Sequence, residues 1–411
     1  MNDTRRGDFT RCSFLFLLAV GVIVGMLGCD QDADLYACDI RKETCQDDIF
    51  YAVARLRGTL WDPWLDRPPT RVITADDYRA ELLAAQEQAQ QGEATYDYFE
   101  AAKELLGLLD PDRTTTSSID AQVANVAAYY DFGPGEVTII DHGDSGDLTV
   151  GTYILGHELV HAAQDRELGL AFFGSSDTYD GYYARRAIIE GEARLYENLL
   201  QLELQRLDVE QADWAGYHER LLANAREDVF LAESPEFELY GLLYPLGAIF
   251  LTDRYLEDGN QAVRDVWADL PVQVGQLLGG GHGAMPEPLP LLDCQAPSAP
   301  TGYEYRTQAV MGALPFFGVS TRLADSVASA WAMAEALQGD RLYVYARDEA
   351  HTTLVWHLSI ETAQREAVLE AAQGYYGAGA VELVDDRITV VLSTEAELPE
   401  WEDARSCSGA N

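Results

Sequence analysis

Basic residues are scarce in this sequence: 28 Lys and Arg stand against 69 Asp and Glu among 411 residues, a formal net charge of −41. A ligand held mainly through phosphates needs a positive surface, which argues against nucleic acid as a partner. The chain also lacks a repeat of fixed period, which argues against a repeat architecture. With 47% hydrophobic residues it can bury a sizeable core, and its dispersed acidic residues fit the solvated surface of a secreted protein.

The first 28 residues have the pattern of a targeting segment. Three arginines precede an uncharged apolar run, residues 12–27, which is short for a spanning helix. Residues 26–29, Met-Leu-Gly-Cys, resemble a bacterial lipoprotein cleavage box. We therefore expect residues 1–28 to be a signal peptide, Cys29 to be lipidated, and the protein to be an exported lipoprotein of the cell envelope. An uncleaved N-terminal anchor is the alternative.

Four cysteines follow the predicted lipidation site: Cys38, Cys45, Cys294 and Cys407. An even number of cysteines in an exported protein predicts disulfides. The short spacing favours a bond between Cys38 and Cys45, and Cys294 with Cys407 would then tie a linker to the C-terminus. Four cysteines allow three pairings, so this pairing is a hypothesis.

Hydrophobic periodicity predicts an α+β fold that is predominantly helical. Before the C-terminal part, helices are expected at residues 75–93, 96–109, 152–168, 182–207, 214–231 and 239–256, with a β-hairpin of residues 125–131 and 136–141. A small C-terminal α+β unit is expected from helices at 326–337 and 363–373 and from strands at 341–346, 353–358 and within 381–392. The predicted organisation is a signal peptide (1–28), an N-terminal tether with a disulfide (29–70), a main domain (71–277), a Gly/Pro-rich connection (278–310) and the C-terminal unit (311–411).

Residues 157–161, His-Glu-Leu-Val-His, lie in the helix expected at 152–168. Residues four apart share one face of an α-helix, so His157 and His161 can direct their imidazoles at one metal ion. Glu158 then lies beside the metal, where its carboxylate can polarise a zinc-bound water. Because catalytic zinc takes three protein ligands and keeps one open position, a third ligand must come from another segment.

The third ligand is expected to be Glu190, 29 positions after His161 in the next long helix. Gly191 follows it, and since glycine inside a helix costs about 1 kcal/mol against alanine, it indicates a close backbone approach near the metal helix. Glu192 would point to the other side of that helix. The pattern His-Glu-x-x-His followed by Glu-Gly-x-Ala resembles the gluzincin metallopeptidases, notably their aminopeptidase branch, and this resemblance implies that Glu190 binds the zinc.

A looser resemblance covers residues 75–392 and is to a family of exported, mostly uncharacterised bacterial metallopeptidase-like proteins. It is carried by residues 127–131, 157–165, 187–193, 244–247 and 339–345. The resemblance implies a zincin-like metallopeptidase core, with the β-hairpin before the metal helix and Zn²⁺ as the cofactor.

Other side chains are candidates for supporting roles. Tyr244 is the predicted catalytic group that faces the oxyanion, with Tyr240 and His218 as alternatives. Asp165, four residues after His161, could hold that imidazole through its free N–H.

These patterns predict a zinc-dependent peptidase of the cell envelope that acts on a peptide or protein substrate. Arg185 and Arg186 either contact a substrate carboxylate or balance the local acidity, and one strand of the hairpin could pair with an extended peptide. Two alternatives stay open. One is a non-enzymatic envelope lipoprotein whose structural or vestigial zincin core acts as a binding module, and the other is an unrelated helical protein with a fortuitous motif.

Overall fold

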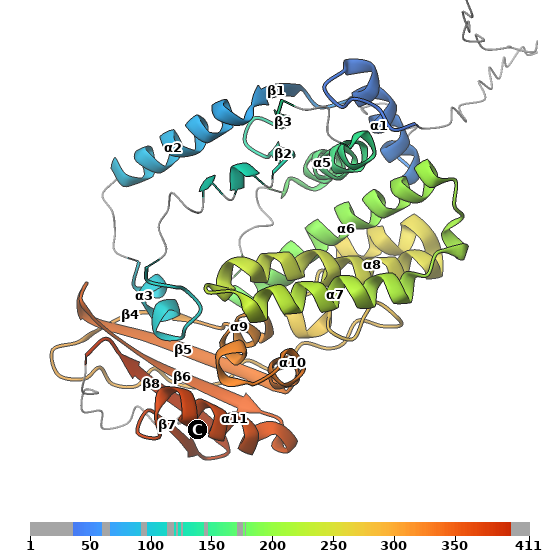
Figure 1. The fold of residues 1–411 in the computed structure, drawn as a ribbon. Helices are drawn as coiled ribbons and strands as arrows, with labels where there is room; N and C mark the ends of the chain where they lie inside the picture. The colour runs from blue at the N-terminus through green and yellow to red at the C-terminus, as the bar shows by residue number, and fades with distance from the viewer. Residues whose placement is uncertain are drawn as a thin grey trace, which may run out of the picture.

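The computed structural model describes residues 36–59, 66–91, 97–112, 119–120, 122–124, 126–143, 147–170, 176 and 178–395. The predicted signal peptide, the predicted lipidation site Cys29 and Cys407 lie outside these residues. The described part is a mixed α+β fold dominated by helices, as the sequence predicts (Figure 1). Within it, no helix is both long and apolar enough to cross a membrane.

A three-stranded sheet lies in the upper part of Figure 1. Across the sheet its strands are β1 (Thr70–Thr74), β3 (Glu136–Asp141) and β2 (Ala128–Asp131). β3 pairs in parallel with β1 and antiparallel with β2, so the predicted hairpin is confirmed. Because β3 has a neighbour on each side, the prediction that either hairpin strand could receive a peptide is wrong for β3. β2 is an edge strand of this sheet.

Long helices pack around one core below and beside this sheet. They are α1 (Glu43–Leu56), α5 (Leu148–Leu168), α6 (Tyr179–Gln205), α7 (Trp214–Leu231) and α8 (Pro235–Ala268). α2 (Ala75–Gln91) packs instead against β1 and β3. α6 packs against α5 on one side and α8 on another, and α7 packs on α8. α8 is interrupted at Asp258 and Gly259, whose backbone angles are not helical. Short 3₁₀ helices are η2 (Val209–Gln211) and η3 (Val274–Gln276).

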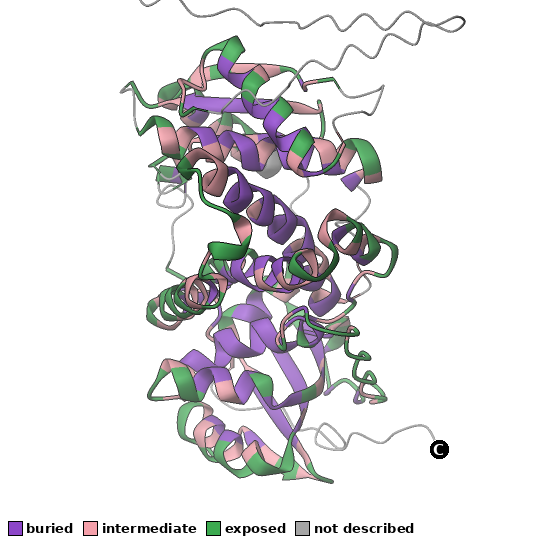
Figure 2. Ribbon diagram, turned by 90° about the vertical axis from the view of Figure 1, so that its right-hand side faces the viewer, coloured by how far each residue is buried: buried purple, intermediate pink, exposed green. Residues whose placement is uncertain are grey.

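The C-terminal part is a five-stranded sheet with helices packed on it. Its strands, in spatial order, are β4 (Glu304–Ala309), β5 (Leu337–Asp348), β6 (His351–Ile360), β8 (Arg387–Ser393) and β7 (Val381–Val384), and all pairs are antiparallel. The accompanying helices are α3 (Tyr98–Leu105), α9 (Ala313–Leu323), α10 (Val327–Glu335) and α11 (Thr362–Tyr376). Figure 2 shows the sheet as largely buried, and it shares a hydrophobic cluster with α3, α9 and α11.

Two segments that the sequence predicts to be irregular contain regular structure. Residues 29–70, the predicted tether, include α1, whose Ile49, Phe50 and Val53 are buried in the main core. Residues 278–310, the predicted connection, include β4, an edge strand of the larger sheet. In both cases the partners are distant in sequence: α1 packs on α5 and α6, and β4 pairs with β5.

α6 and α8 approach most closely where glycines meet. A Cβ atom added to Gly247 would lie 1.7 Å from the carbonyl oxygen of Ala187, and one added to Gly191 would lie 2.2 Å from the carbonyl carbon of Gly247. The close approach predicted at Gly191 is therefore present. Its partner is α8, however, and not the histidine-bearing helix α5 that the sequence predicts. This contact fixes α6, which carries Glu190, against α8.

We expect Gly247→Ala to lower the free energy of unfolding by at least about 2 kcal/mol, because the added methyl group would overlap the backbone of α6. Gly241→Ala, on the same helix, is the matched control, since a Cβ atom there meets nothing within 4 Å. The control should raise stability by up to about 1 kcal/mol through better helix propensity. Urea unfolding, monitored by circular dichroism, gives the free energy of unfolding of each variant. Equal changes in the two variants would refute the close contact.

Candidate metal centre

The two histidines and Glu190 come from neighbouring helices with well-defined ends. Asp147 caps the N-terminus of α5 by accepting the N–H of Thr149, and Gly169 ends the helix with a left-handed φ of 68°. Thr178 caps α6 by accepting the N–H of Gly181. α5 packs against α6, and Gln164 of α5 donates to the carbonyl of Ile189 in α6.

Three donor atoms converge between these helices. The Nε2 atoms of His157 and His161 are 3.1 Å apart, and Oε2 of Glu190 lies 3.5 Å from the first and 3.3 Å from the second. All three residues are buried, with exposed fractions of 6–7%. The structure thus brings together the three residues predicted as ligands, and this buried group could hold a metal ion.

A hydrogen-bond acceptor at Nδ1, the nitrogen turned away from Glu190, orients each imidazole. Nδ1 of His157 lies 3.0 Å from Oε2 of Glu197, and Nδ1 of His161 lies 2.9 Å from Oε1 of Gln164. The Gln164 amide is itself fixed, because its Nε2 donates to the carbonyl of Ile189. Both Nδ1 atoms therefore carry a proton, and both Nε2 atoms are turned towards Glu190.

The electrostatics of this group favour positive charge. Burial alone would lower the pKa of His157, but hydrogen bonds to Glu190 and Glu197 outweigh it and raise that pKa to about 10. Burial alone would raise the pKa of Glu190, but the charge of His161 and hydrogen bonds from both imidazoles hold it well below its usual value. A metal ion at this point would displace the proton on Nε2 of His157 and would then meet an ionised carboxylate and two oriented nitrogens.

Glu158 lies beside the group and is held by the sheet. Its Oε2 accepts the backbone N–H of Tyr130 at 2.8 Å, which ties it to edge strand β2. Burial raises the pKa of Glu158, and the nearby imidazoles of His157 and His161 oppose that rise. The carboxyl group is thus next to the three donor atoms without being one of them, as the sequence predicts for a proton acceptor.

Tyr244 and Arg186 also border the group. The ring of Tyr244 stacks on that of His157, with centroids 5.8 Å apart and an angle of 29° between the planes. Desolvation of its hydroxyl, followed by the charges of Glu190 and Glu158, raises its pKa. Tyr244 is 38% exposed as a whole, so part of the residue reaches solvent. Arg186 Nη2 lies 3.1 Å from Oε1 of Glu190, the oxygen turned away from the histidines.

Glu192 points away from the metal group, as the helical spacing predicts. Its Oε1 accepts a 2.7 Å bond from Arg57, a buried side chain that follows α1. Its Oε2 accepts from Trp267 Nε1 at 2.8 Å and from Gln164 Nε2 at 3.0 Å. Through Gln164, the orientation of His161 is therefore coupled to a buried ion pair with the N-terminal segment.

The predicted role of Asp165 is wrong. Its Oδ2 accepts the hydroxyl of Tyr130 and its Oδ1 accepts the N–H of Leu170, while Gln164 takes the ring nitrogen of His161. Asp165 therefore ties α5 to the sheet. Sequence reasoning missed both real partners, Gln164 and Glu197. The available signal is position: Glu197 lies seven residues, two turns, after Glu190 and so on the same face of α6.

The two alternatives to Tyr244 have other ring partners. Tyr240 is one turn before it on α8, and its ring contacts that of Tyr183 at 5.7 Å. His218 is buried on α7 against Trp214, with ring centroids 5.7 Å apart, and does not belong to the three-residue metal group.

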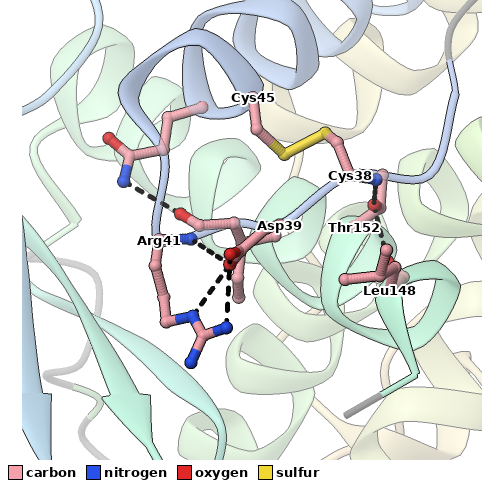
Figure 3. Close-up of a disulfide and its surroundings, with 8 residues drawn as sticks. Cys38, Asp39, Arg41, Cys45, Leu148 and Thr152 are labelled. Carbon is pink, nitrogen blue, oxygen red and sulfur yellow. Dashed lines mark hydrogen bonds and ion pairs between the residues drawn. A yellow bond between two sulfur atoms is a disulfide. The ribbon is translucent and has the colours of Figure 1, made fainter. Parts of the chain in front are cut away.

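The disulfide between Cys38 and Cys45 is confirmed, and it lies over the first turns of α5 (Figure 3). The N–H of Cys38 donates to the Thr152 hydroxyl, which in turn donates to the carbonyl of Leu148. Cys294 is disulfide-bonded as well. Cys407, its predicted partner, lies outside the described residues, so that pairing stays a prediction.

No family model, no curated protein and no solved structure matches the chain.

We expect Glu197→Ala to weaken metal binding by about 10- to 100-fold, because the imidazole of His157 loses the acceptor that orients it. The control is Asp165→Asn, which alters a carboxylate near His161 that does not contact its ring and should change affinity less than about twofold. Competition with a metal-binding dye gives both affinities. A larger loss in Asp165→Asn than in Glu197→Ala would show that the orienting groups are assigned wrongly.

Proposed function

We propose that the protein is a zinc-dependent peptidase of the gluzincin type. The single observation that carries this proposal is the convergence of two imidazole nitrogens and a carboxylate oxygen, with Glu158 beside them. That arrangement combines a metal-binding trio with a neighbouring proton acceptor, which is the pairing that metal-assisted hydrolysis needs. The resemblance of the two motifs to gluzincins supports the same conclusion.

The spacing of the donors supports zinc as the metal. Two ligands of one tetrahedral zinc ion, each about 2.0–2.1 Å from it, lie about 3.3 Å apart. The three distances between donor atoms, 3.1, 3.3 and 3.5 Å, scatter around this value. Two histidines and one glutamate also make a set of three protein ligands, which leaves a fourth position for water or substrate.

Each neighbouring residue has a role in this proposal. Zinc supplies Lewis acidity, which acidifies water and polarises a carbonyl group. Glu158, held by the amide of Tyr130, takes a proton from the attacking water and returns it to the leaving amine. Tyr244, whose raised pKa keeps its hydroxyl protonated, donates a hydrogen bond to the oxygen that gains charge.

An extended peptide is the substrate class that fits the edge strand. The N–H of Tyr130 points out of the sheet to Glu158, so the outer edge of β2 faces the metal group. Ala128, two residues earlier in the strand, turns its backbone groups to that same edge. A peptide added there as a further strand would place its carbonyl groups near the histidines.

The disulfide supports the proposed location. A Cys38–Cys45 bond is stable in an oxidising compartment and rare in the cytosol. Because an apolar run typical of a signal peptide precedes Cys29, we propose that the protein is an exported lipoprotein of the cell envelope. A lipid on Cys29 would anchor it to a membrane.

One observation favours a second candidate, a non-enzymatic envelope lipoprotein whose zincin-like core is a binding module. The three donor residues have exposed fractions of only 6–7%, and closed metal sites are typically structural. The two candidates differ in turnover: both predict bound metal, and only the peptidase predicts cleavage.

We expect Glu158→Gln to lower peptide cleavage at least about 100-fold while the zinc content stays unchanged, because the variant loses the proton acceptor and keeps all three ligands. Glu366→Gln makes the same change at an exposed position of α11, outside the metal group, and should retain activity. Cleavage is measured with a quenched fluorescent peptide library, and zinc by mass spectrometry. Unchanged cleavage by Glu158→Gln would refute the assigned role, and no cleavage by the zinc-loaded native protein would favour the binding module.

A further inference from the structure

Arg186 is a cation next to the metal group that the proposed reaction does not use. It lies one helical turn before Glu190 on α6, and its side chain is 28% exposed. Among the described residues its ion-pair partner is Oε1 of Glu190, and its buried Nε–H has no acceptor. One contact engages only one of the five N–H groups of a guanidinium. Arg186 therefore has donors to spare beside the site.

The charge of this guanidinium acts on two phenol groups of α8. Burial raises the pKa of Tyr240 and of Tyr244, and the charge of Arg186 opposes that rise in both. A guanidinium presents a planar fork of N–H donors, which suits a planar anion such as a carboxylate.

The local charge also suits an anion once a metal is bound. Around the three donor atoms lie the carboxylates of Glu158, Glu190 and Glu197 and the guanidinium groups of Arg186 and Arg194. Their formal sum is about −1, and a divalent cation changes it to about +1. In a protein of net charge −41, this point becomes a local positive site.

We propose that Arg186 binds the free C-terminal carboxylate of the peptide substrate, which makes the enzyme a carboxypeptidase or a peptidyl-dipeptidase. This inference rests on the proposed function. Nη2 of Arg186 lies 3.1 Å from Oε1 of Glu190, so the guanidinium is next to the proposed metal ligand. Since an extended peptide advances about 3.3 Å per residue, a carboxylate bound to this guanidinium would lie within one or two residues of the bond that is cleaved.

Binding to an inactive form tests this proposal without relying on turnover. Zinc-loaded Glu158→Gln protein is titrated by calorimetry with N-acetylated pentaalanine, once with a free C-terminal carboxylate and once with a C-terminal amide. We expect the acid to bind at least tenfold more tightly than the amide. Equal affinities for the two peptides, or no binding of either, would overturn the proposal whether or not the native protein cleaves peptides.

Variants at two adjacent arginines show which side chain causes the tighter binding of the acid peptide. In the Glu158→Gln protein, the additional substitution Arg186→Gln should abolish the preference for the acid peptide. Arg186→Lys keeps the charge but loses the planar fork, so it should reduce that preference several-fold. Arg185→Gln makes the same change about 100° round the helix and should keep the preference. Zinc content is measured for each variant, because Arg186 also contacts Glu190. A preference that persists in zinc-loaded Arg186→Gln would show that Arg186 only neutralises Glu190, and would overturn the proposal.

Discussion

The candidate metal centre depends on the packing of α5 against α6, which directs two imidazole nitrogens and one carboxylate oxygen at a single point. Because Nε2 of His157 and Nε2 of His161 lie 3.1 Å apart and both face Glu190, lone pairs on all three atoms would repel one another unless a proton or a metal ion lies between them. Burial strengthens this repulsion, because water cannot screen the charge of the carboxylate. A metal ion would satisfy all three groups at once, and the proposed chemistry depends on its binding.

Much of the surrounding fold holds this meeting point in place. α6 is held against α8 by the contact of Gly191 with Gly247, which excludes any side chain between the two backbones. On another side, Glu192 pairs with Arg57, so the segment after α1 anchors the same helix. Strand β2 is tied to α5 twice through Tyr130, by its amide to Glu158 and by its hydroxyl to Asp165. The helices and the small sheet therefore position the site jointly.

The sequence predicted the parts of the site that depend on spacing along one helix. The separation of His157 and His161, and the glycine after Glu190, are local signals that need no knowledge of the fold. Glu197 and Gln164 could not be predicted in this way. Each accepts a hydrogen bond from one imidazole, and which imidazole it reaches depends on how α5 and α6 pack. α1 escaped prediction for a similar reason: its apolar side chains have helical spacing, but their burial depends on helices more than 100 residues away.

Metal analysis of the purified protein tests the central claim most directly. Inductively coupled plasma mass spectrometry of the native protein after exposure to zinc should find about one zinc ion per chain, because three preformed donors have a common target. Glu190→Ala, which removes one donor and leaves both histidines, should retain little zinc while keeping the native circular dichroism spectrum. A native protein without bound metal, or a Glu190→Ala variant with a full zinc complement, would contradict the account.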